Sequence, residues 1–172
     1  MEVLIRPIEP WDDPEVESII REVMTSYGLD RPGSALHDPE VRSMASAYRL
    51  DGYRYFVAEV DGKVVGGGGI GPLVGGDKGV CELRKMYVLP EARGKGIGKR
   101  LLENCRESAK SLGYRTCYLE TLAEMTEARR LYERNGFQQV CAPMGQTGHC
   151  ACDTWYCLEL WGLESEIRNG AT

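Results

Sequence analysis

The sequence predicts an α+β fold in which a mixed, mostly antiparallel central sheet is flanked by helices. One observation is the order of extended and amphipathic stretches: strand, helices, three strands, helix, strand, helix, two strands. A second is the segment from Cys81 to Gly113, where a strand, a glycine-rich turn and a helix lead into another strand, as in a crossover between parallel strands. A third is length, since 172 residues and 19.2 kDa fit one domain, 1–172, with its own core.

The charge balance and the hydropathy pattern exclude several classes of function. The chain has 21 basic and 26 acidic residues and a formal net charge of -5, so nonspecific nucleic-acid binding is not expected. It contains no run of about 18 apolar residues and no charged leader followed by an apolar stretch. We therefore expect no membrane partner, no secretion and a cytoplasmic location.

The first fifty residues predict a strand, a helix and an irregular segment. Val3–Ile5 is extended and apolar, and Asp12-Asp13-Pro14 is a typical helix start. An apolar face continues this helix to about Tyr27. The segment from Leu29 to Leu50 is interrupted by prolines and a glycine, and we expect a short helix from Glu40 to Tyr48.

A hairpin follows, in which Tyr53–Val60 and Lys63–Ile70 are joined by a turn at Asp61-Gly62. The second strand and the residue after it contain the spacing G-x-G-x-x-G at Gly66, Gly68 and Gly71. A dinucleotide-binding loop needs a helix directly after this pattern, and Pro72 with the later glycines cannot begin one. A complete G-x-x-x-x-G-K-[S/T] phosphate loop is also missing from the sequence.

The central segment combines a strand, a turn and a helix around an expected anion site. Glu82–Leu89 suits a strand that Pro90 stops, and the apolar positions from Ile97 to Leu112 have helical spacing. Between them, the glycines and basic residues of Arg93–Gly98 bring backbone amides and cations to the start of a helix. One diphosphate group would satisfy this arrangement.

The last third of the chain predicts a further strand, a helix and two final strands. The strand is Thr116–Thr121, and the helix runs from Ala123 to Asn135. Phe137–Ala142 and Thr154–Leu160 are the final strands, joined by a loop of proline, glycine and small polar residues. The tail, 161–172, is expected to be frayed.

The seven cysteines predict free thiols that behave as small hydrophobic residues. Their number is odd, and no leader directs the chain to an oxidising compartment. The cluster His149-Cys150-Ala151-Cys152, with Cys157 nearby, contains zinc-ligand types. Because Cys-x-Cys lacks a second matching pair, we predict no bound metal.

Two motifs connect the chain to a known family. The pattern Arg-x-x-Gly-x-Gly, at Arg93, Gly96 and Gly98, follows a Y-V-x-P-E strand end and precedes an amphipathic helix. The later segment A-R-R-L-Y-E-R-N-G-F adds a second match. Together they resemble the GNAT superfamily of N-acetyltransferases, over about Tyr53 to Leu160. The resemblance implies a GNAT-like acyl-CoA N-acyltransferase fold, in which the parallel strands splay to admit the pantetheine arm.

The resemblance also implies that acetyl-CoA is the cosubstrate and that its diphosphate binds the segment Arg93–Gly98, called the glycine loop below. The residues expected to bind it are Met86, Tyr87, Val88, Arg93, Gly94, Lys95, Gly96, Ile97, Gly98 and Lys99.

Acetyl transfer to an amine needs a base, an acid and a group that stabilises the oxyanion. An alkyl ammonium has a pKa of about 10.4, so at neutral pH a base must take a proton from the acceptor. Glu82 is the expected base, with Glu120 or a water molecule as the alternative. Tyr132 occupies the position of the family's tyrosine near the coenzyme sulfur, and a phenol suits a proton donor to the thiolate. A backbone amide near Met86–Val88 would stabilise the oxyanion. Many relatives have asparagine where this chain has Met125.

The expected reaction moves an acetyl group from acetyl-CoA to a primary amine of a small molecule, amino acid or peptide, by direct attack in a ternary complex. The alternative is a noncatalytic acyl-CoA-binding or sensing module. The acceptor is expected to contact Leu29–Leu50 and Pro143–Asp153, with Tyr27, His37 and Tyr48 as candidates. The sequence leaves monomer and homodimer open.

Overall fold

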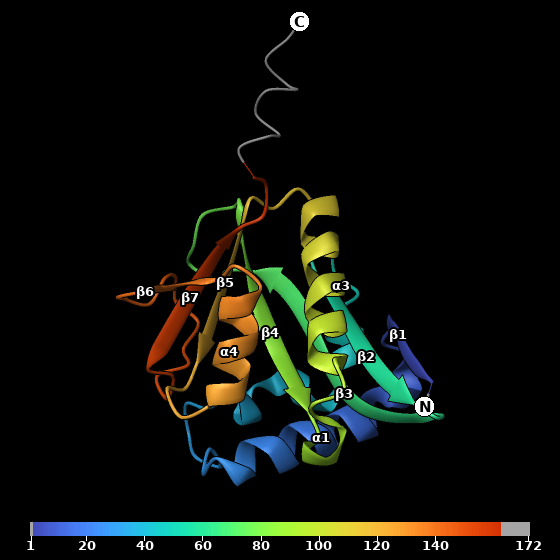
Figure 1. Ribbon diagram of the computed structural model, residues 1–172. Coiled ribbons are helices and arrows are strands. Elements are labelled where there is room, and N and C mark those ends of the chain that lie inside the picture. The colour runs from blue at the N-terminus through green and yellow to red at the C-terminus, as the bar shows by residue number, and fades with distance from the viewer. Residues whose placement is uncertain (1, 163–172) are drawn as a thin grey trace, which may run out of the picture.

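The computed structural model describes residues 2–162, which contain one seven-stranded sheet. Figure 1 shows its arrangement. The strands are β1 (Val3–Pro7), β2 (Arg54–Val60), β3 (Lys63–Pro72), β4 (Val80–Val88), β5 (Thr116–Thr121), β6 (Gln138–Val140) and β7 (Thr154–Glu159). Their order in the sheet is β1-β2-β3-β4-β5-β7-β6, and every pair is antiparallel except β4 and β5. The mixed, mostly antiparallel sheet predicted from the sequence is confirmed.

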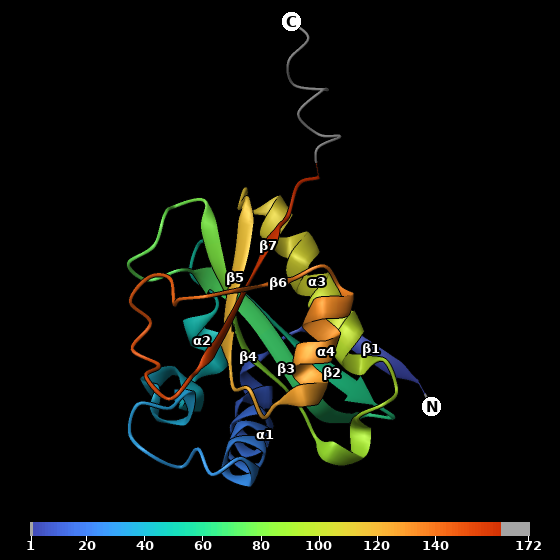
Figure 2. The ribbon, with the colours of Figure 1, turned by 60° about the vertical axis from the view of Figure 1, so that its left-hand side comes forward.

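Helices cover both faces of this sheet (Figures 1 and 2). The α-helices are α1 (Asp13–Ser26), α2 (Met44–Ala47), α3 (Ile97–Ser111) and α4 (Thr126–Arg134). Short 3-10 turns occur at η1 (Pro10–Asp12), η2 (Ala35–His37), η3 (Pro39–Arg42) and η4 (Pro90–Ala92). Figure 2 shows α3 and α4 on one side of the sheet and α1 and α2 on the other. No helix of the part of the chain that the structure describes is long and apolar enough to cross a membrane.

Two of the predicted helices differ from the structure in their limits. The helix expected from Glu40 to Tyr48 is split into η3 and α2, because Ser43 adopts φ -149° and ψ 49°, outside the helical region. The helix expected from Ala123 begins at Thr126 instead. There the backbone N–H of Ala123 donates to Asp153 Oδ1 at 2.8 Å, so this residue belongs to a turn tied to the β7 side.

The parallel pair β4 and β5 separates after a short ladder. Its paired residues are Val80 with Thr116, Cys81 with Cys117 and Glu82 with Tyr118. Beyond Glu82 no further pair forms, although β4 continues to Val88 on its β3 side. The sheet therefore opens at its centre, next to α4.

The glycines of strand β3 leave space for the ring of Tyr55, which packs against the strand. A Cβ atom at Gly67 or Gly69 would lie 2.7 or 2.5 Å from atoms of the Tyr55 ring. The Tyr55 hydroxyl then donates to the carbonyl of Lys85 at 2.8 Å. Lys85 has φ 49°, at an irregularity in the β3–β4 register. The glycines thus belong to a strand, in agreement with the exclusion of a dinucleotide-binding loop.

The core explains three of the seven cysteines. Cys81, Cys105 and Cys117 are fully buried in the cluster between the sheet and α3, where a thiol packs as a small apolar group. All seven cysteines are free thiols in the structure.

The predicted frayed tail, 161–172, lies outside the described residues except for its first two positions. Of these, Trp161 is fixed, because its indole N–H donates to the Tyr114 carbonyl at 2.9 Å.

Candidate active site

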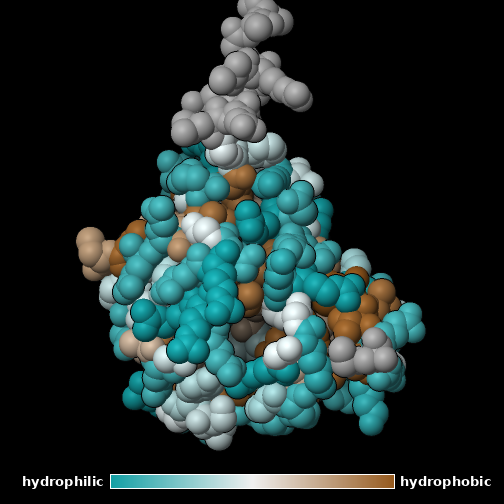
Figure 3. All heavy atoms as spheres, in the orientation of Figure 1, coloured by the Kyte–Doolittle hydropathy of each residue, from teal (hydrophilic) through white to brown (hydrophobic). Residues whose placement is uncertain are grey.

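An outer groove runs between the glycine loop and α4. It is lined by Met86, Tyr87, Val88, Arg93, Gly94, Gly96, Ile97, Gly98 and Lys99, together with residues of α1 and α4. Figure 3 shows a hollow with apolar side chains at its floor on the face that carries α3 and α4. All the residues predicted to bind the cofactor line this groove except Lys95, whose ammonium donates to the Glu91 carbonyl at 3.0 Å.

The glycine loop has the backbone geometry of an anion site. Gly94 and Gly96 have φ of 73° and 75°, in the left-handed region that glycine tolerates best. α3 begins directly after Gly96, so its first N–H groups have no partner within the helix. Arg130 and Arg134 of α4 also line the groove and add positive charge that the sequence motif did not indicate.

The side chain of Tyr132 lies where the outer groove meets an inner pocket, since it lines both. Its ring packs against Phe137 and Tyr156, with centroid distances of 5.8 and 6.2 Å. Within the described part of the chain, its hydroxyl makes no hydrogen bond. Burial raises the pKa of Tyr132 well above its usual value, so the phenol keeps its proton at neutral pH. Met125, which stands where many relatives have asparagine, also lines both the groove and the pocket.

The inner pocket presents two carboxylates from adjacent strands. Glu82 of β4 pairs in register with Tyr118 of β5, and Glu120 lies two residues further on, so these side chains share one face of the sheet. Cys81, Cys117 and Leu119 face the opposite side, in the α3 core. Both Glu82 and Glu120 line the pocket.

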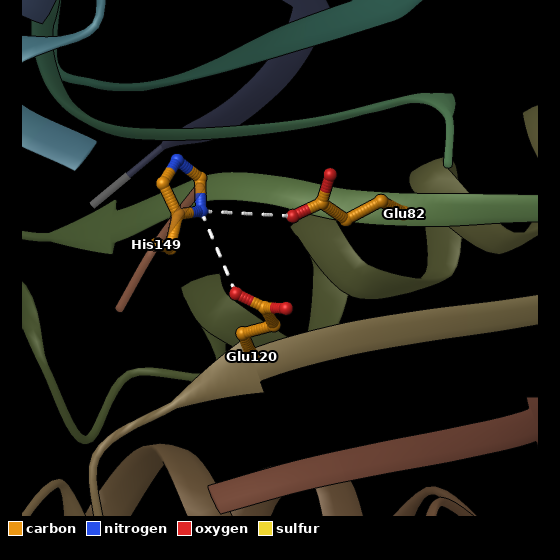
Figure 4. Close-up of side chains that lie close together, drawn as sticks. All are labelled: Glu82, Glu120 and His149. Atoms are coloured by element: carbon orange, nitrogen blue, oxygen red, sulfur yellow. Dashed lines mark ion pairs between the residues drawn. The ribbon is translucent and has the colours of Figure 1, made fainter. Parts of the chain in front are cut away.

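His149, from the loop before β7, completes this group. Figure 4 shows both carboxylates turned toward the same ring nitrogen. His149 Nδ1 lies 3.9 Å from Glu82 Oε1 and 3.7 Å from Glu120 Oε2. Glu120 is held by the hydroxyls of Tyr118 and Thr147, at 2.8 and 2.9 Å.

Glu82 is almost completely buried, and its charge is only partly compensated. Burial raises the pKa of Glu82 above its usual value, and the nearby Glu120 adds to this, while Arg84 and His149 oppose it. Arg84 Nε donates to Glu82 Oε2 at 2.9 Å. The other oxygen, Oε1, is the one that faces His149.

The other ring nitrogen of His149 lies 3.0 Å from Asp38 Oδ2. This hydrogen bond raises the pKa of His149, and burial opposes it. Burial also opposes ionisation of Asp38, but the hydrogen bond from His149 and the charge of Lys85 outweigh it and lower the Asp38 pKa. With its proton on Nε2, the neutral imidazole presents Nδ1 to the pocket as an acceptor.

Lys85 joins the same network from the β4 irregularity. Its ammonium is buried and forms ion pairs with Asp38 and, at 3.3 Å, with Glu40. The segment after α1 is therefore fixed to the sheet by charge as well as by packing.

The residues proposed from the sequence to touch the acceptor lie elsewhere. Tyr27 lines the outer groove. His37 is half exposed and lies 3.4 Å from Asp30, and the buried Tyr48 donates to Glu40 at 3.0 Å. None of the three lines the inner pocket. Sequence reasoning chose them by residue type. It placed Asp38 and His149 within the two segments expected to contact the acceptor but did not single out either side chain for this pocket, because irregular segments have no periodicity that predicts where a side chain points.

Among residues 2–162, Glu82, Glu120 and His149 also form a group that could hold a cation, since one donor atom from each lies within 4.8 Å of the others. Cys150 and Cys152 are not part of it. Arg84, in contact with Glu82, opposes a doubly charged metal ion more than a singly charged ammonium, and an ammonium has three N–H donors for three acceptors. The absence of a bound metal stays a prediction.

Comparison with known proteins agrees with this architecture. The model of the acetyltransferase (GNAT) family matches residues 16–137. A relative named "Uncharacterized N-acetyltransferase YjgM", from Escherichia coli (strain K12), is 41% identical over 158 residues, which are 91% of this chain and 95% of that protein.

Solved structures share the fold, among them the following two. A GNAT-family acetyltransferase from Staphylococcus aureus Mu50 has a TM-score of 0.81 at 22% identity, covering 93% of this chain and all of that one. The yncA structure from Salmonella typhimurium, which contains its cofactor acetyl-CoA, has a TM-score of 0.75 at 22% identity, covering 94% of this chain and 96% of that one. The chain therefore belongs to the acetyltransferase (GNAT) family and is an acyltransferase.

Proposed function

We propose that the protein transfers an acetyl group from acetyl-CoA to a primary amine by direct attack in a ternary complex. The observation that carries this proposal is the meeting of two hollows at Tyr132. On one side is the groove of the glycine loop, and on the other is the pocket of Glu82, Glu120 and His149. A thioester in the groove and an amine in the pocket would meet at this point, which is the positioning that the reaction requires.

The outer groove is proposed as the site of acetyl-CoA. The left-handed glycines and the free amides at the start of α3 suit the diphosphate, and the arginines of α4 suit its charge. A structural neighbour was solved with acetyl-CoA, which supports the same cosubstrate here.

The side chains are assigned roles by their surroundings. Glu82, with its raised pKa and its free oxygen toward the pocket, takes a proton from the acceptor ammonium, directly or through Glu120, His149 or water. Tyr132 keeps its proton at neutral pH and gives it to the departing thiolate. The oxyanion is stabilised by a backbone N–H near Met86–Val88.

A noncatalytic acyl-CoA-binding module would need the outer groove alone. The inner pocket, with two carboxylates and an imidazole aimed at one point, has a use only if an acceptor reacts there. The test is release of free CoA thiol from acetyl-CoA in the presence of a panel of primary amines, with the acetylated product identified by mass spectrometry. Thiol release that depends on an amine supports the proposal, and its absence across amines, amino acids and peptides would overturn it.

A further inference from the structure

We propose that the acceptor is a primary amine with no carboxylate beside its amino group, and that a neutral hydrogen-bonding group on it reaches Ser34. This inference rests on the proposed function, and it specifies the class of amine that the inner pocket selects.

The first argument is that every cation lining the inner pocket is already paired. These are the permanent cations Arg84 and Lys85 and, when it is protonated, His149. Arg84 donates to Glu82 at 2.9 Å and to the Pro72 carbonyl at 3.1 Å. Lys85 is paired with Asp38 and Glu40, and His149 Nε2 with Asp38. A carboxylate on the acceptor would find no uncommitted positive charge among the described pocket residues.

The second argument is the sign of the remaining charge. Four carboxylates surround or support the pocket, those of Asp38, Glu40, Glu82 and Glu120, against two permanent cations and one imidazole. Two of these carboxylates point at the place where the ammonium would bind. In an α-amino acid the carboxylate is attached to the carbon that carries the ammonium, so it would enter the same field. Like charges repel strongly in such an enclosed site, whereas a lone ammonium is attracted.

The third argument is an unpaired hydroxyl. Ser34 is 4% exposed, and its Oγ is fully shielded from solvent and has no hydrogen-bond partner in the described part of the chain. It lines the same inner pocket, beside the apolar side chains of Met24, Leu29 and Leu122. Buried hydroxyl groups are normally hydrogen-bonded, so a ligand group is the natural partner. A hydroxyl or an amide on the acceptor would supply it without bringing charge.

The experiment compares matched sets of three acceptors: valine, valinamide and isobutylamine, and likewise tyrosine, tyrosinamide and tyramine. The amide keeps the shape of the amino acid and removes its charge. Using CoA thiol release, we expect kcat/KM for the amide and the amine to exceed that for the amino acid by at least about tenfold. This ratio corresponds to about 1.4 kcal/mol, which lies within the repulsion of two like unit charges about 4 Å apart, between its values in water and near a protein surface. Amino acids that react as well as their amides would overturn the inference while leaving the N-acetyltransferase function intact. No release with any acceptor would overturn both.

Two variants test the residues. Glu120→Gln removes one negative charge and should reduce the preference for valinamide over valine. Ser34→Ala should lower kcat/KM for valinamide and leave that for isobutylamine, which has no second polar group, nearly unchanged. Ser26→Ala is the control, because its hydroxyl donates to the Val23 carbonyl at 2.6 Å, outside the pocket. If Ser34→Ala lowers kcat/KM equally for valinamide and isobutylamine, or lowers it for neither of them, this hydroxyl does not contact the acceptor.

Discussion

At the scale of single residues, the phenol of Tyr132 can be tested almost in isolation. Its hydroxyl makes no hydrogen bond in the described part of the chain, so removing it leaves no buried partner unsatisfied. We expect Tyr132→Phe to lower turnover by about 10²- to 10⁴-fold with nearly unchanged affinity for acetyl-CoA. Steady-state kinetics with calorimetry of acetyl-CoA binding provides the measurement.

The control for this variant is Tyr114→Phe, which removes a hydroxyl that donates to the Gly52 carbonyl at 2.9 Å, away from both hollows. Normal turnover in the Tyr132 variant would mean that the thiolate departs without a proton donor and that the tyrosine has only a packing role.

Glu82 is expected to limit activity at low pH. The carboxylate must be ionised to act as a base, and its pKa is raised, chiefly by burial. Activity should therefore be lost as pH falls through this raised pKa, at a pH above that of an ordinary glutamate. Glu82→Gln should remove this dependence and leave a steeper rise toward the pKa of the acceptor amine, about 10.4 for an alkyl ammonium. The measurement is kcat/KM against pH.

The same pH profiles distinguish the other bases. If Glu82→Gln keeps the pH profile of the parent protein and Glu120→Gln gives the steep profile, the base is Glu120. If His149→Asn gives the steep profile instead, the base is His149. The acceptor's own pKa must be matched across the series, so one amine is used throughout.

The site divides into residues that the sequence predicted and residues that it did not. The candidates Glu82, Tyr132 and the glycine loop lie in or beside regular elements, where spacing fixes position. Asp38, His149 and Ser34 lie in irregular segments, and only the folded chain brings the first two within 3.0 Å. The acceptor candidates Tyr27, His37 and Tyr48 stay predictions: none of them lines the inner pocket, and Tyr27, which follows α1, lines the outer groove.

At the scale of elements, the two ends of α3 provide a matched pair of glycines. Gly96 before the helix and Gly113 after it have φ of 75° and 85°, and a Cβ at either would meet no atom within 4 Å. A left-handed conformation costs an L-residue roughly 1–2 kcal/mol. We expect Gly96→Val and Gly113→Val to lower stability by similar amounts, measured by thermal unfolding.

Only Gly96→Val should also weaken acetyl-CoA binding, because only that residue lines the outer groove. Calorimetry of both folded variants tests this. Affinity that is equal in the two would falsify the assignment of the glycine loop as the diphosphate site.

Elements with strong periodicity were predicted almost to the residue. The strand Thr116–Thr121 has the predicted limits, and α3 begins at the predicted Ile97. Near the starts of α4 and α2, backbone N–H groups donate to side chains far away in sequence, Ala123 to Asp153 and Ala45 to Asp13, and residue spacing does not encode these contacts.

At the scale of the whole molecule, the Asp38–His149 pair joins two segments that are far apart in sequence, and its strength depends on pH. His149 faces Asp38, Glu82 and Glu120, and also Lys85, which opposes its charge. Its folded pKa is raised, so the stabilisation is fully present below the unfolded value of about 6.5 and is lost as pH rises through the folded value.

We therefore expect His149→Gln to be less stable than the parent protein at pH 6, with a difference that shrinks toward pH 9. Thermal unfolding across this range provides the measurement, and the surface variant His37→Gln is the control. A difference that is constant with pH would mean that the imidazole contributes by packing alone.

The short ladder between β4 and β5 gives the sheet a third edge, inside the molecule. From Leu83 to Val88, β4 is paired on its β3 side only, so its other side makes no ladder hydrogen bonds with a neighbouring strand, as in an edge strand. At the outer edge of a sheet, such a strand can pair with a strand of another chain, which leads to aggregation. Here α4 lies beside the opening (Figure 1), and Met86, Tyr87 and Val88 of this unpaired stretch line the outer groove together with residues of α4. We expect hydrogen exchange of the backbone amides in this stretch to slow when acetyl-CoA fills the groove, as the proposed function requires.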